Sequence, residues 1–300
     1  MNANAQTPPA ALDPQPGGPG RRAAHTAAPA AGPADPAAAP AAGPAALQAA
    51  SVSNLNVRFG AAHVLKDVTM AVPAGTVVGL VGESGSGKST LGKTLVGINK
   101  PSSGEVLIAG EDFTKMRGRR RQQMRREVQY IPQDPYSSLS PRRTTGQTLA
   151  EALDPHGANP VEHRKAIAAA LERVKLDPSA AEKYPHQFSG GQRQRIAIAR
   201  ALMLEPKLVI ADEITSALDV SVQADIIRLL QGMRSTVDSA MLFISHNLAV
   251  VQQVCDEVVV MFQGRIVEQG PIESVYRDPQ HDYTKKLLSS VPGSPGFSLD

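Results

Sequence analysis

The chain has 300 residues, 42% of them hydrophobic, and a formal net charge of +3. Because no stretch reaches the roughly 18 consecutive apolar residues that a membrane-spanning helix needs, the sequence predicts no membrane crossing. The single cysteine, Cys255, excludes an intrachain disulfide and any all-cysteine metal or iron–sulfur site built by this chain alone.

Residues 1–50 differ in composition from the rest of the chain. They are mostly alanine, proline and glycine, with no aromatic residue and few branched aliphatic ones. Such a segment cannot bury enough apolar surface to offset the entropy of ordering it, so we predict a disordered arm ahead of one folded unit. A twin-arginine export signal is disfavoured, because proline interrupts the residues after Arg21 and Arg22 and no leucine-like core follows.

The folded part begins with alternating apolar segments and continues with unbroken ones. LNVRF and VLKDVTMAV alternate as half-buried antiparallel strands do, whereas TVVGLVG at 76–82 is continuously apolar. Further continuous runs follow at 128–131, 208–211 and 241–244. Runs of this kind suit strands that are covered on both faces, so we predict an α/β fold with a parallel sheet flanked by helices.

Helical spacing dominates between the second and third of these runs. Ile167, Leu171 and Val174, for example, recur near the helical period. We therefore predict a helical insertion at about 134–204 within the α/β core. Another amphipathic helix is predicted at 220–237, and a last one near 284–290.

A phosphate-binding motif directly follows the apolar run at 76–82. The segment GESGSGKS fits G-x-x-x-x-G-K-[ST] between a predicted strand and a predicted helix. Glycines let successive backbone N–H groups point at a phosphate, and the helix that follows adds its positive end. Lys88 can bridge the β- and γ-phosphates, and the Ser89 hydroxyl is a hard oxygen that suits Mg²⁺. The predicted nucleotide-binding residues of this loop are Gly82, Glu83, Ser84, Gly85, Ser86, Gly87, Lys88, Ser89 and Thr90.

This motif alone indicates a nucleoside triphosphate and does not separate kinases, GTPases, helicases and transport motors. Two adjacent carboxylates, Asp212 and Glu213, end the later apolar run at 208–211. At the edge where a parallel sheet opens its ligand crevice, Asp212 can hold Mg²⁺ through its water shell and Glu213 can polarise the attacking water. Phosphoryl transfer needs positioning and charge stabilisation, so it requires no nucleophilic side chain.

The motif that narrows the family is SGGQRQR at 189–195, which runs directly into the apolar stretch IAIARAL. A serine and two glycines at a helix start make a second phosphate-facing cap. The motif resembles the LSGGQ signature of ABC ATPases, with Phe188 where leucine is commoner. The resemblance implies that a monomer lacks a complete site, because the signature residues close over ATP on the opposite subunit. These residues are Ser189, Gly190, Gly191 and Gln192.

Further segments follow in the order that this family requires. The resemblance implies that Gln133 is the Q-loop glutamine, which touches Mg²⁺ and the water and senses the membrane partner. It implies that His246 is the switch histidine on the γ-phosphate and that Phe59 stacks on adenine. Taken alone, Phe59 also fits a core position and His246 a structural one. The implied D-loop consists of Ser216, Ala217, Leu218 and Asp219.

The resemblance spans about residues 52–292 and implies an ABC ATPase fold. This fold has a P-loop NTPase (RecA-like) core, an antiparallel β subdomain and an α-helical insertion subdomain. It implies an ATPase domain at 51–270 and a short C-terminal extension at 271–300. It also implies ATP and Mg²⁺ as cofactors and an ATPase activity coupled to transmembrane transport. The implied Mg²⁺ residues are Ser89, Gln133 and Asp212.

Two segments are similar to the oligopeptide/dipeptide importer branch, which includes nickel and glutathione systems. They are QDPYSSLSPR at 133–142 and DPQHDYTKKLL at 278–288, where Asp282 replaces the usual proline. This similarity implies import of peptides or similar small solutes, powered by this chain at the cytoplasmic face of the membrane. The implied partners are two transmembrane permease subunits, a second ABC ATPase subunit and, indirectly, an extracytoplasmic solute-binding protein. Without a cysteine-rich extension, the chain resembles the other member of a two-ATPase pair.

The basic run KMRGRRRQQMRR at 115–126 has no aromatic residues between its charges, so we expect a solvated or partner-facing surface and no nucleic-acid partner. Two alternatives to the importer stay open. One is a soluble ABC ATPase that acts on ribosomes or DNA. The other is a weakly hydrolysing regulatory half of a heterodimer. Ile214 keeps the latter open, because the usual proline would fix φ in the turn that aims Glu213. A second departure from the family pattern is Thr145, which replaces a usual valine in the neighbourhood of the Q-loop.

Overall fold

The structure is a computed structural model that describes residues 48–134, 138–216, 218–234 and 239–289. The predicted arm up to residue 47 lies outside these ranges, as does Ala217 of the predicted D-loop. The end of the helix predicted at 220–237 and the last residues of the C-terminal extension also lie outside them.

An antiparallel sheet forms the first layer, in the strand order β2-β1-β4-β5. Its strands are β1 (Gln48–Phe59), β2 (Ala62–Pro73), β4 (Ser103–Ile108) and β5 (Glu111–Asp112). Strand β1 begins at Gln48, before the predicted end of the arm at residue 50. Ala49 and Ala50 are buried in this strand, where Ala50 pairs with Val72, because a methyl side chain fits a packed strand position as well as it fits a linker.

A second sheet has six strands in the order β10-β9-β3-β8-β7-β6. They are β3 (Val77–Val81), β6 (Val128–Ile131), β7 (Leu208–Asp212), β8 (Ala240–Ile244), β9 (Glu257–Phe262) and β10 (Arg265–Pro271). All neighbours in this sheet are parallel except β9 and β10. The four continuous apolar runs of the sequence are β3, β6, β7 and β8, so their prediction as parallel strands is confirmed. The hairpin of β9 and β10 was not predicted.

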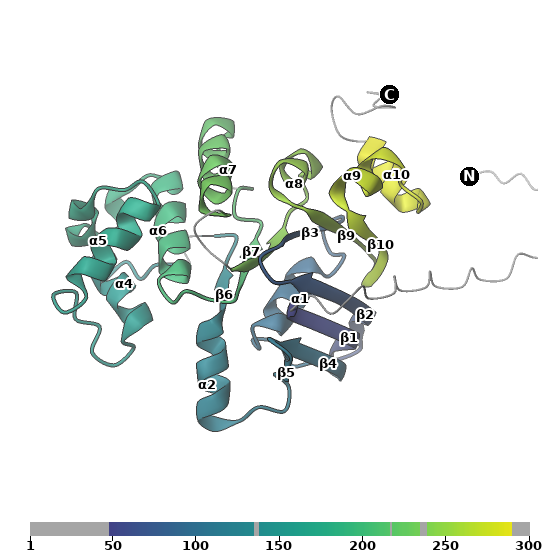
Figure 1. The fold of residues 1–300 in the computed structure, drawn as a ribbon, viewed down its shortest axis with the longest axis horizontal. Helices are drawn as coiled ribbons and strands as arrows, with labels where there is room; N and C mark the ends of the chain where they lie inside the picture. The colour runs from purple at the N-terminus through teal and green to yellow at the C-terminus, as the bar shows by residue number, and fades with distance from the viewer. Residues whose placement is uncertain (1–47, 135–137, 217, 235–238, 290–300) are drawn as a thin grey trace, which may run out of the picture. The chain divides into compact units, whose positions relative to one another are not determined.

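Helices occupy most of the remaining described chain (Figure 1). They are α1 (Lys88–Leu95), α2 (Gly118–Glu127), α4 (Thr145–Leu153), α5 (Arg164–Arg173), α6 (Gly190–Leu202), α7 (Val220–Arg234), α8 (Leu248–Val254), α9 (Ile272–Arg277) and α10 (Asp282–Ser289), with short 3-10 turns η1 (Pro178–Glu182) and η2 (Pro185–Gln187). Helices α4, α5 and α6 contact one another and fall within the range predicted as a helical insertion.

The six-stranded sheet separates two hydrophobic cores. Along β3, Val77 and Val81 face a core that also contains side chains of α4 to α10. Val78 and Leu80, on the opposite face, pack with α1 and the antiparallel sheet. This alternation explains why β3 is apolar at nearly every position, since each face of a strand buries every second residue.

The basic run forms α2 and part of the turn before it, and several of its charges have partners. Arg120 pairs with Glu111 of β5, and the Arg121 guanidinium lies 4.9 Å from the centre of the Phe113 ring. At Asp112, burial alone would raise the pKa of the carboxyl, but hydrogen bonds from Lys115 and Thr114 outweigh it and lower the pKa to about 2.

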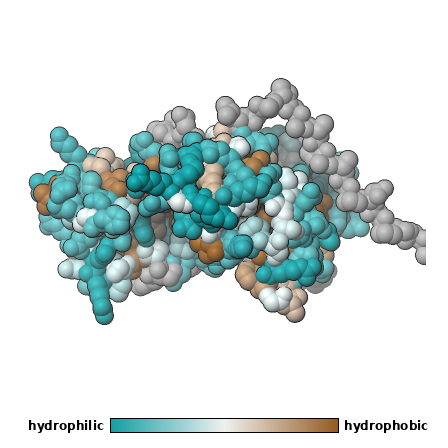
Figure 2. Space-filling model, turned by 90° about the horizontal axis from the view of Figure 1, so that it is seen from below, coloured by the Kyte–Doolittle hydropathy of each residue, from teal (hydrophilic) through white to brown (hydrophobic). Residues whose placement is uncertain are grey.

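The face shown in Figure 2 is mainly hydrophilic, with apolar residues singly or in small groups. Within the described ranges, no helix combines the length and apolar character that crossing a membrane requires.

Candidate nucleotide-binding site

The phosphate loop joins β3 to α1 and is shaped by its glycines. Gly82, Gly85 and Gly87 have φ values of 150°, 80° and 108°, which side chains rarely allow. A Cβ atom on Gly82 would lie 2.1 Å from the carbonyl oxygen of Met261, so the loop rests directly on the backbone at the end of β9. The Gly264 N–H donates to the Ser86 carbonyl at 3.0 Å and fixes the other side of the loop.

Lys88 lies beneath this loop and is only 4% exposed. Its Nζ donates to the carbonyl oxygens of Gly82 at 2.7 Å and Glu83 at 2.9 Å. Burial lowers the pKa of the Lys88 ammonium, and the carboxylates of Glu213 and Asp212 act in the opposite direction. The cation therefore lies between the loop and the two acidic residues predicted at the site.

Asp212 ends β7 and is buried, with both carboxylate oxygens bonded. Oδ1 accepts from the Ser89 hydroxyl at 3.0 Å, and Oδ2 accepts from the Tyr130 hydroxyl at 2.5 Å. Burial and the bond to Asp212 raise the pKa of the Tyr130 phenol, so it stays protonated and donates. Two of the residues predicted around Mg²⁺ thus meet at one place.

Tyr130 is a further residue of this site, which no sequence motif marked. Strand β6 lies beside β7 in parallel register, with Tyr130 opposite Ile210. That register carries the phenol to the end of β7, where Asp212 begins the acidic pair. A tyrosine within an apolar strand is the only signal that the sequence offered, because a buried phenol needs a hydrogen-bond partner.

Two predicted catalytic residues converge on one carboxylate oxygen of the third, Glu213. Gln133 Nε2 donates to Glu213 Oε2 at 3.1 Å, and His246 Nδ1 lies 3.5 Å from the same oxygen. The Glu213 N–H donates to the Ile244 carbonyl at 2.9 Å, which attaches this residue to the end of β8. Glu213 itself has φ of 48°, an unusual value for a residue with a side chain.

Ile214, which replaces the usual proline, is 1% exposed and belongs to the core that contains side chains of α4 to α10. The side chain therefore anchors the turn after Glu213 by packing, in a position where proline would act by fixing φ.

The signature residues form the N-terminus of α6. The Ser189 hydroxyl accepts from the Gln192 N–H at 3.3 Å, and the Gln192 side chain accepts from the Ser189 N–H at 3.0 Å. This reciprocal capping box leaves Ser189, Gly190 and Gln192 exposed, whereas Gly191 is buried. A Cβ atom on Gly191 would lie 2.3 Å from Val222 of α7, so these two helices touch there.

The described residues of the predicted D-loop contact both the residues around Glu213 and the signature residues. Ser216 Oγ accepts from Gln133 Nε2 at 3.2 Å and donates to the Glu213 carbonyl at 2.9 Å. Leu218 lies 3.7 Å from the position of a Cβ on Gly190. Asp219 caps α7, and hydrogen bonds from Ser221 and the Val222 N–H lower the pKa of its carboxyl.

Two predicted parts of the site stay separate within the described part of the chain. There, no hydrogen bond or ion pair joins residues 189–192 to the phosphate loop. Phe59, at the end of β1, is 52% exposed, so it is not a core residue. Its exposed ring is available for stacking, and the adenine role stays a prediction.

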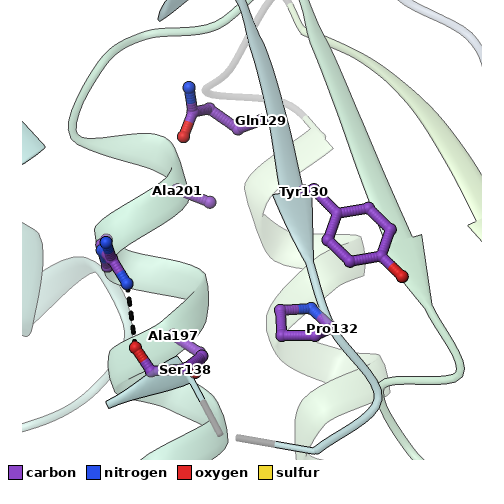
Figure 3. A pocket seen from close by; sticks show the side chains of 7 residues that line it. Gln129, Tyr130, Pro132, Ser138, Ala197 and Ala201 are labelled. Atoms are coloured by element: carbon purple, nitrogen blue, oxygen red, sulfur yellow. Dashed lines mark hydrogen bonds between the residues drawn. The ribbon is translucent and has the colours of Figure 1, made fainter. Parts of the chain in front are cut away.

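A cavity of about 150 Å³ lies between β6 and α6. Figure 3 shows the Gln129 side chain on the α6 side of β6 and the Tyr130 ring on the other side. Arg200 also lines the cavity and donates to the Ser138 carbonyl at 2.9 Å. Pro132, which lines the cavity, directly precedes Gln133 at the point where the chain leaves β6.

The donors at this site fit Mg²⁺ better than a softer metal. A hydroxyl, a carboxylate and an amide oxygen are hard ligands of the kind that Mg²⁺ uses together with substrate phosphates and water. Among the residues that the structure describes, no group of three or more His, Cys, Asp or Glu side chains could hold a metal. A magnesium ion would therefore depend on Ser89, Asp212 and Gln133 with the phosphates of a nucleotide.

Comparison with known proteins places the chain among transport ATPases. The profile of the ABC transporter family matches residues 65–216. A candidate peptide import ATP-binding protein of Brucella ovis is 47% identical over 236 residues, which are 78% of this chain and 74% of that protein. The glutathione import ATP-binding protein GsiA of Escherichia coli is 48% identical over 231 residues, which are 77% of this chain and 37% of GsiA.

Solved structures show the same fold. The structure of cbiO1 from Clostridium perfringens, part of the ABC transporter complex cbiONQ, has a TM-score of 0.69 at 31% identity and covers 77% of this chain and 91% of cbiO1. A dimeric ATP-binding cassette in a post-hydrolysis state, bound to ADP and Pi, has a TM-score of 0.66 at 26% identity, over 74% of this chain and 98% of the cassette.

Proposed function

Because this chain belongs to the ABC transporter family, as an ATP-binding subunit, we propose that it hydrolyses ATP to power the import of peptides or similar small solutes. The peptide and glutathione importers named above support this class of solute. So does the similarity of segments 133–142 and 278–288 to the oligopeptide/dipeptide branch. The solute itself is selected by the other subunits.

ATP binding falls to the phosphate loop and the residues beneath it. The backbone N–H groups of the loop and the start of α1 surround the phosphates, and Lys88 bridges the β- and γ-phosphates. Mg²⁺, when bound, neutralises charge on these phosphates, and Ser89, Gln133 and Asp212 would hold it. Phe59 stacks on the adenine.

Hydrolysis depends on the convergence of Gln133 and His246 on Glu213, which is the observation that carries this proposal. Glu213 orients and polarises the attacking water. Because both neighbours contact Oε2, the other oxygen, Oε1, is left to accept a proton from the water. His246 would also contact the γ-phosphate, so it links the Glu213 carboxylate to the phosphate that is cleaved.

The complete site requires a second cassette. Residues 189–192 share no hydrogen bond with the phosphate loop of their own chain, and their exposed helix N-terminus suits a phosphate on an opposing subunit. The dimeric cassette with ADP and Pi is consistent with this arrangement. The proposed partners are two transmembrane permease subunits, a second ATPase and, indirectly, an extracytoplasmic solute-binding protein. We place this chain itself at the cytoplasmic face of the membrane.

The test compares the wild-type chain with Glu213→Gln, and with Glu172→Gln on the exposed side of α5 as a matched control. We expect Glu213→Gln to lower ATP turnover by about 100-fold or more while ATP binding persists, and the control to leave turnover unchanged. Equal turnover in Glu213→Gln and wild type would overturn the catalytic assignment.

The transport assignment is tested by co-purification from detergent-solubilised membranes of the native host. We expect two permeases and a second, cysteine-bearing ATPase to accompany the chain. Ribosomal or DNA-repair proteins without a permease would replace the importer by a soluble ABC ATPase. A wild-type complex that binds ATP with almost no turnover would indicate the regulatory half of a heterodimer.

A further inference from the structure

The C-terminal helix α10 reaches the phosphate loop through one tyrosine. Tyr283 is 7% exposed, and its hydroxyl accepts a hydrogen bond of 2.9 Å from the Glu83 N–H, which lies 200 residues away in the chain. The carbonyl of the same Glu83 accepts from Lys88 at 2.9 Å. Both polar backbone groups of this residue are therefore fixed, one by α10 and one by the phosphate-binding lysine.

Contacts on several sides fix the orientation of Tyr283. Its ring stacks on Phe262 of β9, with ring centres 4.2 Å apart. Its N–H donates to His281 Nδ1 at 3.1 Å. The carboxylate of Glu268 in β10 accepts from the N–H groups of Gln280 at 2.8 Å and His281 at 3.0 Å. The phenol is thus held by the β9–β10 hairpin and by the turn that precedes α10.

The same hairpin supports the other parts of the phosphate loop. Gly82 rests on the Met261 carbonyl, and the Gly264 N–H bonds the Ser86 carbonyl. Among the described residues, no hydrogen bond joins the hairpin to Glu83 directly, and Tyr283, which stacks on Phe262 of the hairpin, extends the support to it. Loss of the Tyr283 hydroxyl would leave the Glu83 N–H without this partner and let the first turn of the loop move.

We propose that Tyr283 is a positioning residue for ATP binding, which holds the Glu83 peptide so that the phosphate loop is preorganised, and through which the C-terminal segment influences nucleotide affinity. This inference rests on the proposed ATP-binding function. A residue that preorganises a binding loop changes affinity more than the chemical step, because its loss adds the cost of ordering the loop to each binding event.

The test is Tyr283→Phe in the full-length chain, which keeps the stacking ring and removes only the hydroxyl. The matched control is Tyr276→Phe in α9, where the hydroxyl of a half-buried tyrosine donates to the Leu248 carbonyl at 2.7 Å and not to the phosphate loop. We expect Tyr283→Phe to weaken ATP binding, measured by titration calorimetry, by about two- to tenfold, the range that a net hydrogen bond supplies.

Two further readouts separate positioning from general stability. We expect amide hydrogen exchange of residues 82–89 to accelerate in Tyr283→Phe, and KM for ATP to rise with kcat retained. Tyr276→Phe should leave the exchange of this loop and the KM unchanged. If wild type binds ATP and Tyr283→Phe matches it in affinity and in loop exchange, the inference is overturned. If wild type binds no ATP, the proposed function fails instead.

Discussion

Replacement of Tyr130 by phenylalanine tests the buried acidic end of β7. The substitution removes the hydroxyl that donates to Asp212 Oδ2 at 2.5 Å and leaves the ring in place. Asp212 is 3% exposed, so water cannot readily take over the lost bond. The remaining partner of the carboxylate, Ser89, bonds the other oxygen.

The magnitude follows from the charge and the burial of the acceptor. A hydrogen bond to a charged group contributes about 1.5–3 kcal/mol to folding stability, and most of this is lost when a buried acceptor no longer has its donor. We therefore expect the free energy of unfolding of Tyr130→Phe to fall by about 2 kcal/mol. For a folded unit of this size, that corresponds to a drop in Tm of about 4–8 °C.

The assay has two parts, thermal unfolding and the Mg²⁺ dependence of ATP turnover. Because Tyr130 orients a proposed metal-site carboxylate, we expect half-maximal turnover to need about tenfold more Mg²⁺. The control is Tyr184→Phe, since Tyr184 is 41% exposed and its loss should change stability by no more than about 0.5 kcal/mol. An unchanged Tm together with an unchanged Mg²⁺ requirement would refute this account of Asp212.

Three further predictions concern the signature, the turn after the catalytic glutamate and an acidic side chain of the antiparallel sheet. Gly191→Ala should lower the urea midpoint of unfolding, because its methyl group would clash with Val222 of α7. Gly190→Ala should keep the midpoint and lower ATP turnover. Equal midpoints for the two variants would contradict the close contact between α6 and α7. Ile214→Pro should change turnover in the assembled complex and also cost stability, with Ile214→Val as the packing control; unchanged turnover would disprove the role given to this turn. Asp112→Asn should destabilise the protein at pH 7. The depressed pKa of Asp112 adds its full stability above pH 3.8 and loses it as pH falls to about 2, so the difference in free energy of unfolding between wild type and variant, measured in urea, should shrink across this range. An undiminished difference at pH 2 would exclude this cause.

Local motifs made most of the site predictable from the sequence. The phosphate loop, the acidic pair and the signature are each written within a few consecutive residues, so they can be recognised without knowing which distant segments pack against them. The predicted family, the α/β fold class and the transport ATPase class are confirmed by the family match and by the relatives and solved structures.

The missed residues depend on distant pairings instead. Tyr130 reaches Asp212 only because β6 lies next to β7, and strand order is not written in either segment. Tyr283 reaches Glu83 across 200 residues, through a β9–β10 hairpin that the sequence analysis did not identify. The edge of the arm was misplaced because alanine packs in a strand position and in a linker equally well.

The contacts of Ser216 and Leu218 have a consequence for mixed assemblies. Ser216 bonds the residues that surround Glu213, and Leu218 lies against Gly190, which is proposed to serve the ATP of the partner. In the proposed two-cassette assembly, the same short segment would therefore belong to both nucleotide sites. A copy altered in this segment would impair its own hydrolysis and that of an intact neighbour. Co-expression with the wild-type gene should therefore give a dominant defect. Extra wild-type protein would relieve this defect only by displacing the altered subunit.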